Sequence, residues 1–116
     1  MTKHIKVGKM GESLASSYFT EKGYQILHKS WRSGNWEVDL IASKNDILHI
    51  IEVKTKSKSD YGFPEDEVSF AKLNYLISAA EIYLNLNPQW QRIQFDVLAI
   101  VLKPDLDFFL IEDVYI

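Results

Sequence analysis

The chain has 116 residues, 47% hydrophobic and 25% charged, and a net charge of −3, which suits one globular domain over residues 1–116 and leaves too little chain for two. It contains no cysteine, so disulfides, thiolate zinc sites and cysteine nucleophiles are excluded. It also has no signal-peptide core and no apolar run of the roughly 18 residues that span a bilayer, so we expect a cytoplasmic protein with no membrane contact.

The first expected element is a helix from Thr2 or Lys3 to Lys22, because apolar residues recur at helical spacing and Gly23 closes the pattern as a residue after a helix end would. Small residues form one strip along this helix: Gly8, Gly11 and Ala15. Such a strip lets a helix approach a sheet closely, and Glu12 lies beside it.

Three strands are expected next. Residues 24–31 read as the first strand, and residues 32–34 as a loop. Residues 36–54 then form a hairpin whose two-residue turn is Asn45-Asp46. In that register Asp39 lies opposite Glu52.

The hairpin therefore has one charged and one apolar face. The charged face carries four side chains: Glu37, Asp39, Glu52 and Lys54, with Glu37 opposite Lys54. The apolar face reads as core: Trp36, Val38, Leu40 and Ala42 against His49, Ile51 and Val53. Two opposed carboxylates are destabilising unless a cation or a shared proton separates them, so the pattern asks what neutralises this pair.

The rest of the chain supplies a second helix and two more strands. Residues 57–67 form a polar loop, and Ser69 caps a helix that ends before Asn87-Pro88. Strands follow at residues 92–102 and 107–114. The order is helix, three strands, helix, two strands, which predicts an α/β fold with a mixed central sheet flanked by helices.

The carboxylate pair predicts a site for Mg²⁺ or Mn²⁺. Asp39 and Glu52 would bind the ion, with the carbonyl oxygen of Val53 as a further ligand. Lys54 would orient or help deprotonate an attacking water, or stabilise charge on a phosphoryl oxygen. Metal and lysine together suit phosphodiester hydrolysis, and Lys56 and Lys58 would extend a basic track for a nucleic-acid backbone.

Asp39, twelve intervening residues and Glu52-Val53-Lys54 resemble the D…E-x-K core of the PD-(D/E)xK nuclease superfamily. The wider pattern is similar to the YraN-like (UPF0102) family of small bacterial proteins, which resemble Holliday-junction resolvases. The residues that carry this resemblance span most of the chain: Gly8, Gly11, Glu12, Ala15, Gly23, Tyr24, Glu37 to Ala42, Glu52 to Lys56, Gly62, Val68, Lys72 and Phe95 to Val97.

The resemblance implies a restriction-endonuclease-like core that cuts DNA, branched or damaged, in repair or recombination. It implies Asp39 and Glu52 as metal ligands, Lys54 as the catalytic lysine, and Glu12 reaching the site from the first helix. A homodimer is implied by analogy with resolvases. Three positions depart from the pattern: Val38 replaces a proline, Trp36 a glycine, and Gln94 a residue that is commonly basic.

Other interpretations of the same residues stay open. The charged face can be a cross-strand ion network with a Glu37–Lys54 salt bridge, and Glu37 can also be a metal ligand or an acid that supports one. Lys72 can hold a phosphate or be a surface lysine, and Asp96 can support the site side of the sheet or do nothing. His49 is interpreted as a structural histidine. The alternative functions are a non-catalytic nucleic-acid-binding module and a protein-interaction domain that kept the nuclease fold.

Overall fold

Helices and strands follow the expected order in a computed structural model that describes residues 3–56 and 70–114. In chain order the elements are α1 (Lys3–Glu21), β1 (Gln25–Ser33), β2 (Trp36–Lys44), β3 (Ile47–Lys56), α2 (Phe70–Leu86), β4 (Ile93–Val101) and β5 (Asp107–Ile111). The expected loop at residues 57–67 and the Ser69 cap lie outside the described residues.

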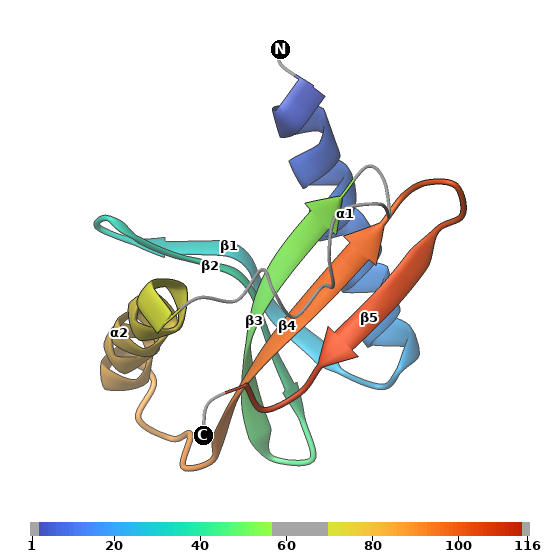
Figure 1. Ribbon diagram of the computed structural model, residues 1–116. Coiled ribbons are helices and arrows are strands. Elements are labelled where there is room, and N and C mark those ends of the chain that lie inside the picture. Colours follow the sequence, from blue (N-terminus) through green and yellow to red (C-terminus); the bar gives the residue numbers. More distant parts are fainter. Residues whose placement is uncertain (1–2, 57–69, 115–116) are drawn as a thin grey trace.

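The five strands form one mixed sheet in the order β1-β2-β3-β4-β5. Strands β3 and β4 are parallel, and the other neighbours are antiparallel. Helices α1 and α2 lie on opposite faces of this sheet (Figure 1). The mixed α/β fold expected from the sequence is therefore confirmed. In the described parts of the chain no helix is both long and apolar enough to cross a membrane.

Each face of the sheet has its own apolar core. The core under α2 is built from Val38, Ile41, Leu48, Ile50, Leu76, Ala79, Ala80, Tyr83 and Phe95. The core under α1 is built from Ala15, Phe19, Tyr24, Leu40, Ala42, Ile51, Leu98 and Ile100. Since both faces are covered, the central strands are apolar on both sides, and a buried charged side chain among them needs a specific partner.

One part of the expected face assignment is wrong. Val38 and Trp36 pack into the core under α2, whereas Leu40 and Ala42 pack under α1. The cause lies in β1, which has a register shift between Ile26 and His28 and a φ of 49° at Ser30. Because β2 pairs with this irregular strand, the side chains of β2 do not alternate strictly between the two faces on either side of Asp39.

Two turns behave as the sequence predicted. Asn45 and Asp46 have φ values of 52° and 65°, as a two-residue hairpin loop requires, and they set the pairs Ser43–Leu48 and Ile41–Ile50. Helix α1 ends at Glu21, and Gly23 follows with a φ of 91°, while the amide of Tyr24 donates to the carbonyl of Phe19 at 3.0 Å.

Element ends differ slightly from the expected ranges. Strand β1 continues through Arg32 and Ser33, because these residues pair with Glu37 and Trp36 instead of forming a loop. Strand β5 ends at Ile111, after which the amide of Val114 donates to the carbonyl of Phe95 at 2.8 Å.

Two residues of the small-residue strip of α1, Gly11 and Ala15, lie against the sheet. A Cβ atom added at Gly11 would lie 1.9 Å from Oγ1 of Thr55, which is far inside van der Waals contact. Ala15 is fully buried one turn further on. Gly11 therefore allows α1 to approach β3 close to its Glu52-to-Lys54 segment.

Candidate active site

The candidate site lies where β2 and β3 separate. Their pairing runs from Lys44–Ile47 to Leu40–Ile51 and goes no further. At the next position the carboxylate of Asp39 replaces the backbone of β2 as the hydrogen-bond acceptor: its Oδ2 accepts a hydrogen bond from the amide of Val53 at 2.8 Å. The side chain of Asp39 is thus held in the fork between the two strands.

The structure brings Asp39 and Glu52 together, as the hairpin register predicted. Burial raises the pKa of Asp39, a hydrogen bond with Glu52 and the charge of Glu52 raise it further, and the result is about 7 instead of 3.8. The amide of Val53 and the charge of Lys72 act in the opposite direction. The two acids are therefore too close to be ionised together without a cation.

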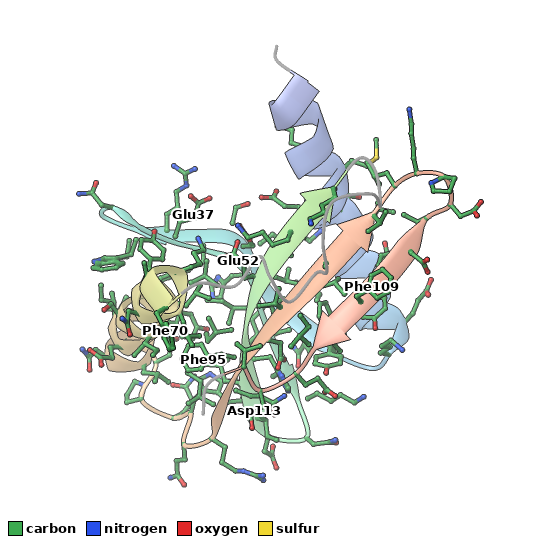
Figure 2. The ribbon with its side chains drawn as sticks, viewed as in Figure 1. Glu37, Glu52, Phe70, Phe95, Phe109 and Asp113 are labelled. Carbon is green, nitrogen blue, oxygen red and sulfur yellow. The ribbon has the colours of Figure 1, made fainter. Side chains whose placement is uncertain are left out.

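Lys72 of α2 supplies a cation in this structure. Its Nζ lies 2.9 Å from Oε2 of Glu52, whose side chain is only 8% exposed. Burial lowers the pKa of Lys72, but the hydrogen bond and charge of Glu52, together with the charges of Asp39 and Tyr75, raise it overall. Figure 2 shows Glu52 in the space between β3 and α2. Lys72 thus neutralises Glu52, while the raised pKa of Asp39 favours the protonated form of that acid.

The contact of Lys72 with Glu52 was missed by sequence reasoning, which left Lys72 as a phosphate ligand or a surface lysine. Nothing in the spacing of the chain links the two residues, since residues 57–69 intervene between β3 and α2. The pairing arises from the docking of α2 on the sheet.

Lys54 follows Glu52 on β3 and shares its face, because β3 is a regular strand through Lys56. The side chains of Lys54 and Lys56 are partly exposed. Lys58 lies outside the described residues. The roles assigned to these three lysines stay predictions.

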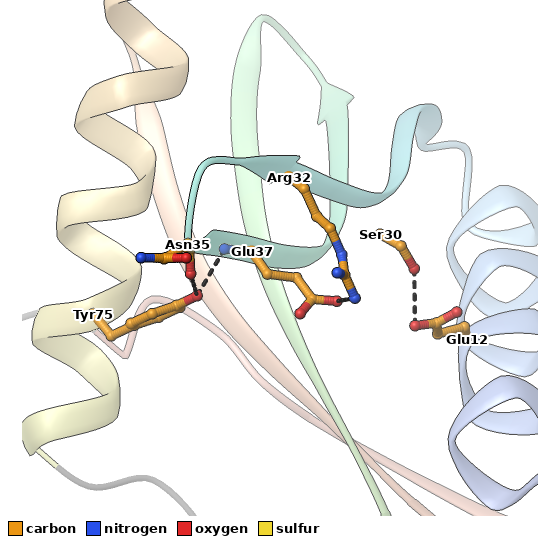
Figure 3. Close-up of polar contacts among 6 residues, drawn as sticks. All are labelled: Glu12, Ser30, Arg32, Asn35, Glu37 and Tyr75. Carbon is orange, nitrogen blue, oxygen red and sulfur yellow. Dashed lines mark hydrogen bonds and ion pairs between the residues drawn. The ribbon is translucent and has the colours of Figure 1, made fainter. Parts of the chain in front are cut away.

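Glu12 lies on α1 and accepts a hydrogen bond from Oγ of Ser30 at 2.9 Å (Figure 3). Within residues 3–56 and 70–114, no three His, Cys, Asp or Glu side chains are close enough to share a metal ion. Glu12 therefore does not form a three-acid cluster with Asp39 and Glu52, and its catalytic role stays a prediction.

The expected pairing of Glu37 with Lys54 is wrong, because β2 and β3 no longer pair at that point. Glu37 contacts Arg32 across the β1–β2 pair instead, with Oε1 3.4 Å from Nη2 (Figure 3). Its amide donates to Oη of Tyr75 at 2.7 Å, and that hydroxyl donates to the carbonyl of Asn35 at 3.1 Å. Tyr75 thereby fixes the β1–β2 turn to α2.

His49 and Asp96 form a separate buried pair. His49 Nδ1 lies 2.6 Å from Oδ2 of Asp96, and Oδ1 accepts hydrogen bonds from Gln94 Nε2 and the amide of Asp113 at 2.9 Å each. His49 packs against the ring of Tyr24, under α1. The interpretation of His49 as structural is confirmed, and Asp96 lies on the opposite face of the sheet from Glu52.

Comparison with known proteins gives matches along most of the chain. Residues 11–100 match the family described as uncharacterised protein family UPF0102. A UPF0102 protein of Chloroherpeton thalassium is 41% identical over 99% of this chain and 97% of its own length. UPF0102 proteins of Bacteroides fragilis and Flavobacterium psychrophilum are 37% and 41% identical, over 89% and 86% of this chain and 85% and 84% of their own lengths.

Proposed function

The chain belongs to the uncharacterised protein family UPF0102, and we propose that it is a metal-dependent nuclease that hydrolyses phosphodiester bonds in DNA. The observation that carries the proposal is the contact between Asp39 and Glu52 in the fork of β2 and β3. A fold gains no stability from two touching carboxylates, so their presence is better explained by a ligand that needs both.

The residues present fit Mg²⁺ or Mn²⁺. A protein usually binds Mg²⁺ through one or two carboxylates, and water and substrate phosphate supply the remaining ligands. Asp39 and Glu52 would hold the ion, and the carbonyl oxygen of Val53 would be a third ligand. When bound, such an ion supplies Lewis acidity and makes water a nucleophile near neutral pH.

The chain's own side chains position and stabilise the reacting groups. Asp39 would have to lose its proton before it could bind a metal ion. Its raised pKa makes this loss of a proton less favourable in the metal-free protein. Lys54, two residues after Glu52 on the same face, orients the attacking water or stabilises charge on the phosphoryl oxygens. Glu12 of α1, which accepts a hydrogen bond from Ser30, is the proposed third acidic residue of the site.

The proposed substrate is DNA that is branched or damaged, processed in the cytoplasm during repair or recombination. Most lysines and arginines lie in residues 1–60, the half that contains the carboxylate fork, which favours the approach of a phosphate backbone to this half. Lys56, Lys58 and Lys72 are the proposed backbone contacts. A homodimer would present two such sites to two strands.

One observation favours a second candidate function. Lys72 already neutralises Glu52 at 2.9 Å, so the fork is satisfied without a metal ion. A nucleic-acid-binding or protein-interaction module that kept the fold would retain this arrangement and hydrolyse nothing.

A cleavage assay separates the two. Labelled single-stranded, duplex, flap and four-way DNA are incubated with Mg²⁺ or Mn²⁺ and wild-type protein, the Glu52→Gln variant, or the Glu81→Gln variant as a control at an exposed acid of α2. Metal-dependent cutting by the wild type and the control but not by Glu52→Gln is the expected result. Equal DNA binding by all three proteins with no cutting would favour the non-catalytic module.

A further inference from the structure

The ammonium of Lys72 contacts the Glu52 carboxylate that would bind a metal ion under the proposed function. We propose that Lys72 is a built-in counter-ion: it pairs with Glu52 in the metal-free protein, leaves it when a divalent cation binds, and then offers its ammonium to a DNA phosphate. This inference rests on the proposed function, because it assigns a positioning residue to the same site.

The competition follows from the contact between the two side chains. Nζ of Lys72 lies 2.9 Å from Oε2 of Glu52, and that carboxylate is 8% exposed, so few directions of approach to it are open. A divalent ion held by Asp39 and Glu52 would stand within a few ångströms of the ammonium. Two cations at such a distance in a partly buried site repel each other strongly.

While it is paired with Glu52, the ammonium of Lys72 also lies over an aromatic ring. Its Nζ lies 4.9 Å from the centroid of the Tyr75 ring, one turn further along α2. A cation over an aromatic face is stabilised by the ring, so the ammonium can leave Glu52 without returning wholly to water.

The Tyr75 ring is held in place. Its hydroxyl bonds the amide of Glu37 and the carbonyl of Asn35 (Figure 3), and the ring of Trp36 lies 4.9 Å away. The ammonium can therefore keep its contact with a fixed ring when a metal ion takes the carboxylate, on the side of the sheet where the substrate phosphate would bind.

This arrangement predicts opposite effects on two ligands. Removing the ammonium relieves the competition at Glu52, so a divalent cation binds more tightly. Removing it also takes away a phosphate contact, so DNA binds more weakly. A residue that only supported the fold would weaken both kinds of binding together.

The test measures Mn²⁺ affinity at pH 8 without DNA, by titration calorimetry, on wild-type protein and Lys72→Met. We expect Lys72→Met to bind Mn²⁺ about five- to tenfold more tightly, the change that loss of one partly buried ion pair would produce. DNA affinity, measured on the same proteins in Ca²⁺, is expected to fall about threefold or more.

Lys44→Met is the matched control. Nζ of Lys44 also lies 4.9 Å over a tyrosine ring, that of Tyr24, and it donates to the carbonyl of Lys22 at 2.8 Å. The substitution makes the same change in net charge and removes the same kind of ring contact, but at a place away from the carboxylates. Its Mn²⁺ affinity is expected to equal that of the wild type.

Lys72→Gln, which keeps a hydrogen-bond donor for Glu52, replaces Lys72→Met if the latter does not fold. Unchanged or weaker Mn²⁺ binding by the folded Lys72 variant, or no binding by any protein, overturns the inference. The nuclease proposal is judged separately by cleavage. Cutting by the wild type with unchanged metal affinity in the variant would remove only the counter-ion role, and tighter Mn²⁺ binding without any cutting would remove only the nuclease.

Discussion

Replacing Asp39 with asparagine is expected to stabilise the metal-free protein and to abolish catalysis. The asparagine side chain keeps an oxygen that can accept the hydrogen bond from Val53, which Asp39 receives at 2.8 Å. It also offers Glu52 a hydrogen-bond donor, as the protonated form of Asp39 does. The substitution removes only the negative charge that the site tolerates poorly.

The size of this stabilisation follows from the pKa of Asp39, which is about 7 in the folded protein and 3.8 for an unperturbed aspartate. Between these pH values the folded protein retains a proton that the unfolded chain has lost, so stability falls as pH rises. Above pH 7 the folded protein has lost all of the stability that this proton gives. The gap between the two pKa values corresponds to a loss of at most about 4 kcal/mol in the free energy of unfolding.

Urea denaturation in EDTA at pH 5 and pH 8 measures this effect. The free energy of unfolding of Asp39→Asn is expected to exceed that of the wild type by about 2–4 kcal/mol at pH 8 and by less at pH 5. Asp107→Asn, at an exposed position at the start of β5, is the control and is expected to show no such pH-dependent gain. An Asp39→Asn variant that is no more stable than the wild type at pH 8, or a gain that is equal at both pH values, would refute the reasoning.

Three further substitutions test the scaffold around the site. Gly11→Ala is expected to cost about 1–3 kcal/mol of unfolding free energy by urea denaturation, because the new methyl group meets Oγ1 of Thr55 at 1.9 Å, and a Thr55→Ala change in the same chain is expected to recover part of the loss. Tyr75→Phe removes the hydroxyl that joins α2 to the β1–β2 turn, so hydrogen exchange at the amide of Glu37 is expected to accelerate, and unchanged exchange would contradict the role given to this contact. Asp96→Asn is expected to cost about 3–5 kcal/mol by urea denaturation, since it leaves a buried carboxylate network incomplete, yet the folded fraction is expected to bind Mn²⁺ as the wild type does, because Asp96 lies on the other face of the sheet.

Local chemistry explains why much of the fold was readable. Asn45 and Asp46 accept positive φ, which fixes a two-residue loop and, through it, the pairs out to Leu40–Ile51. Strand alternation then carried the count one step further, to Asp39 beside Glu52. Gly23 ended the first helix for an equally local reason, because its φ of 91° suits glycine.

Alternation stopped being a reliable guide where the backbone became irregular. Ser30 has a φ of 49° in a strand that contains no glycine, so the sequence gives no sign of this irregularity. Opposite it on β2, Val38 and Leu40 pack into different cores. Glu37 contacts Arg32 and not Lys54, because β2 still pairs with β1 at that point but no longer with β3. A serine in such a conformation has no sequence signature, so these assignments depended on the paired strands.

The sequence by itself determined the order of elements, the main hairpin register and the two carboxylates of the candidate site, because turn residues and strand periodicity act over a few residues. Only the tertiary structure decided what neutralises those carboxylates. Lys72 reaches Glu52 because α2 packs across the sheet, and Asp96 contacts His49 because β4 pairs with β3 and both side chains lie on the face under α1. Contacts between segments far apart in the chain depend on how whole elements dock, and no spacing within the sequence records that.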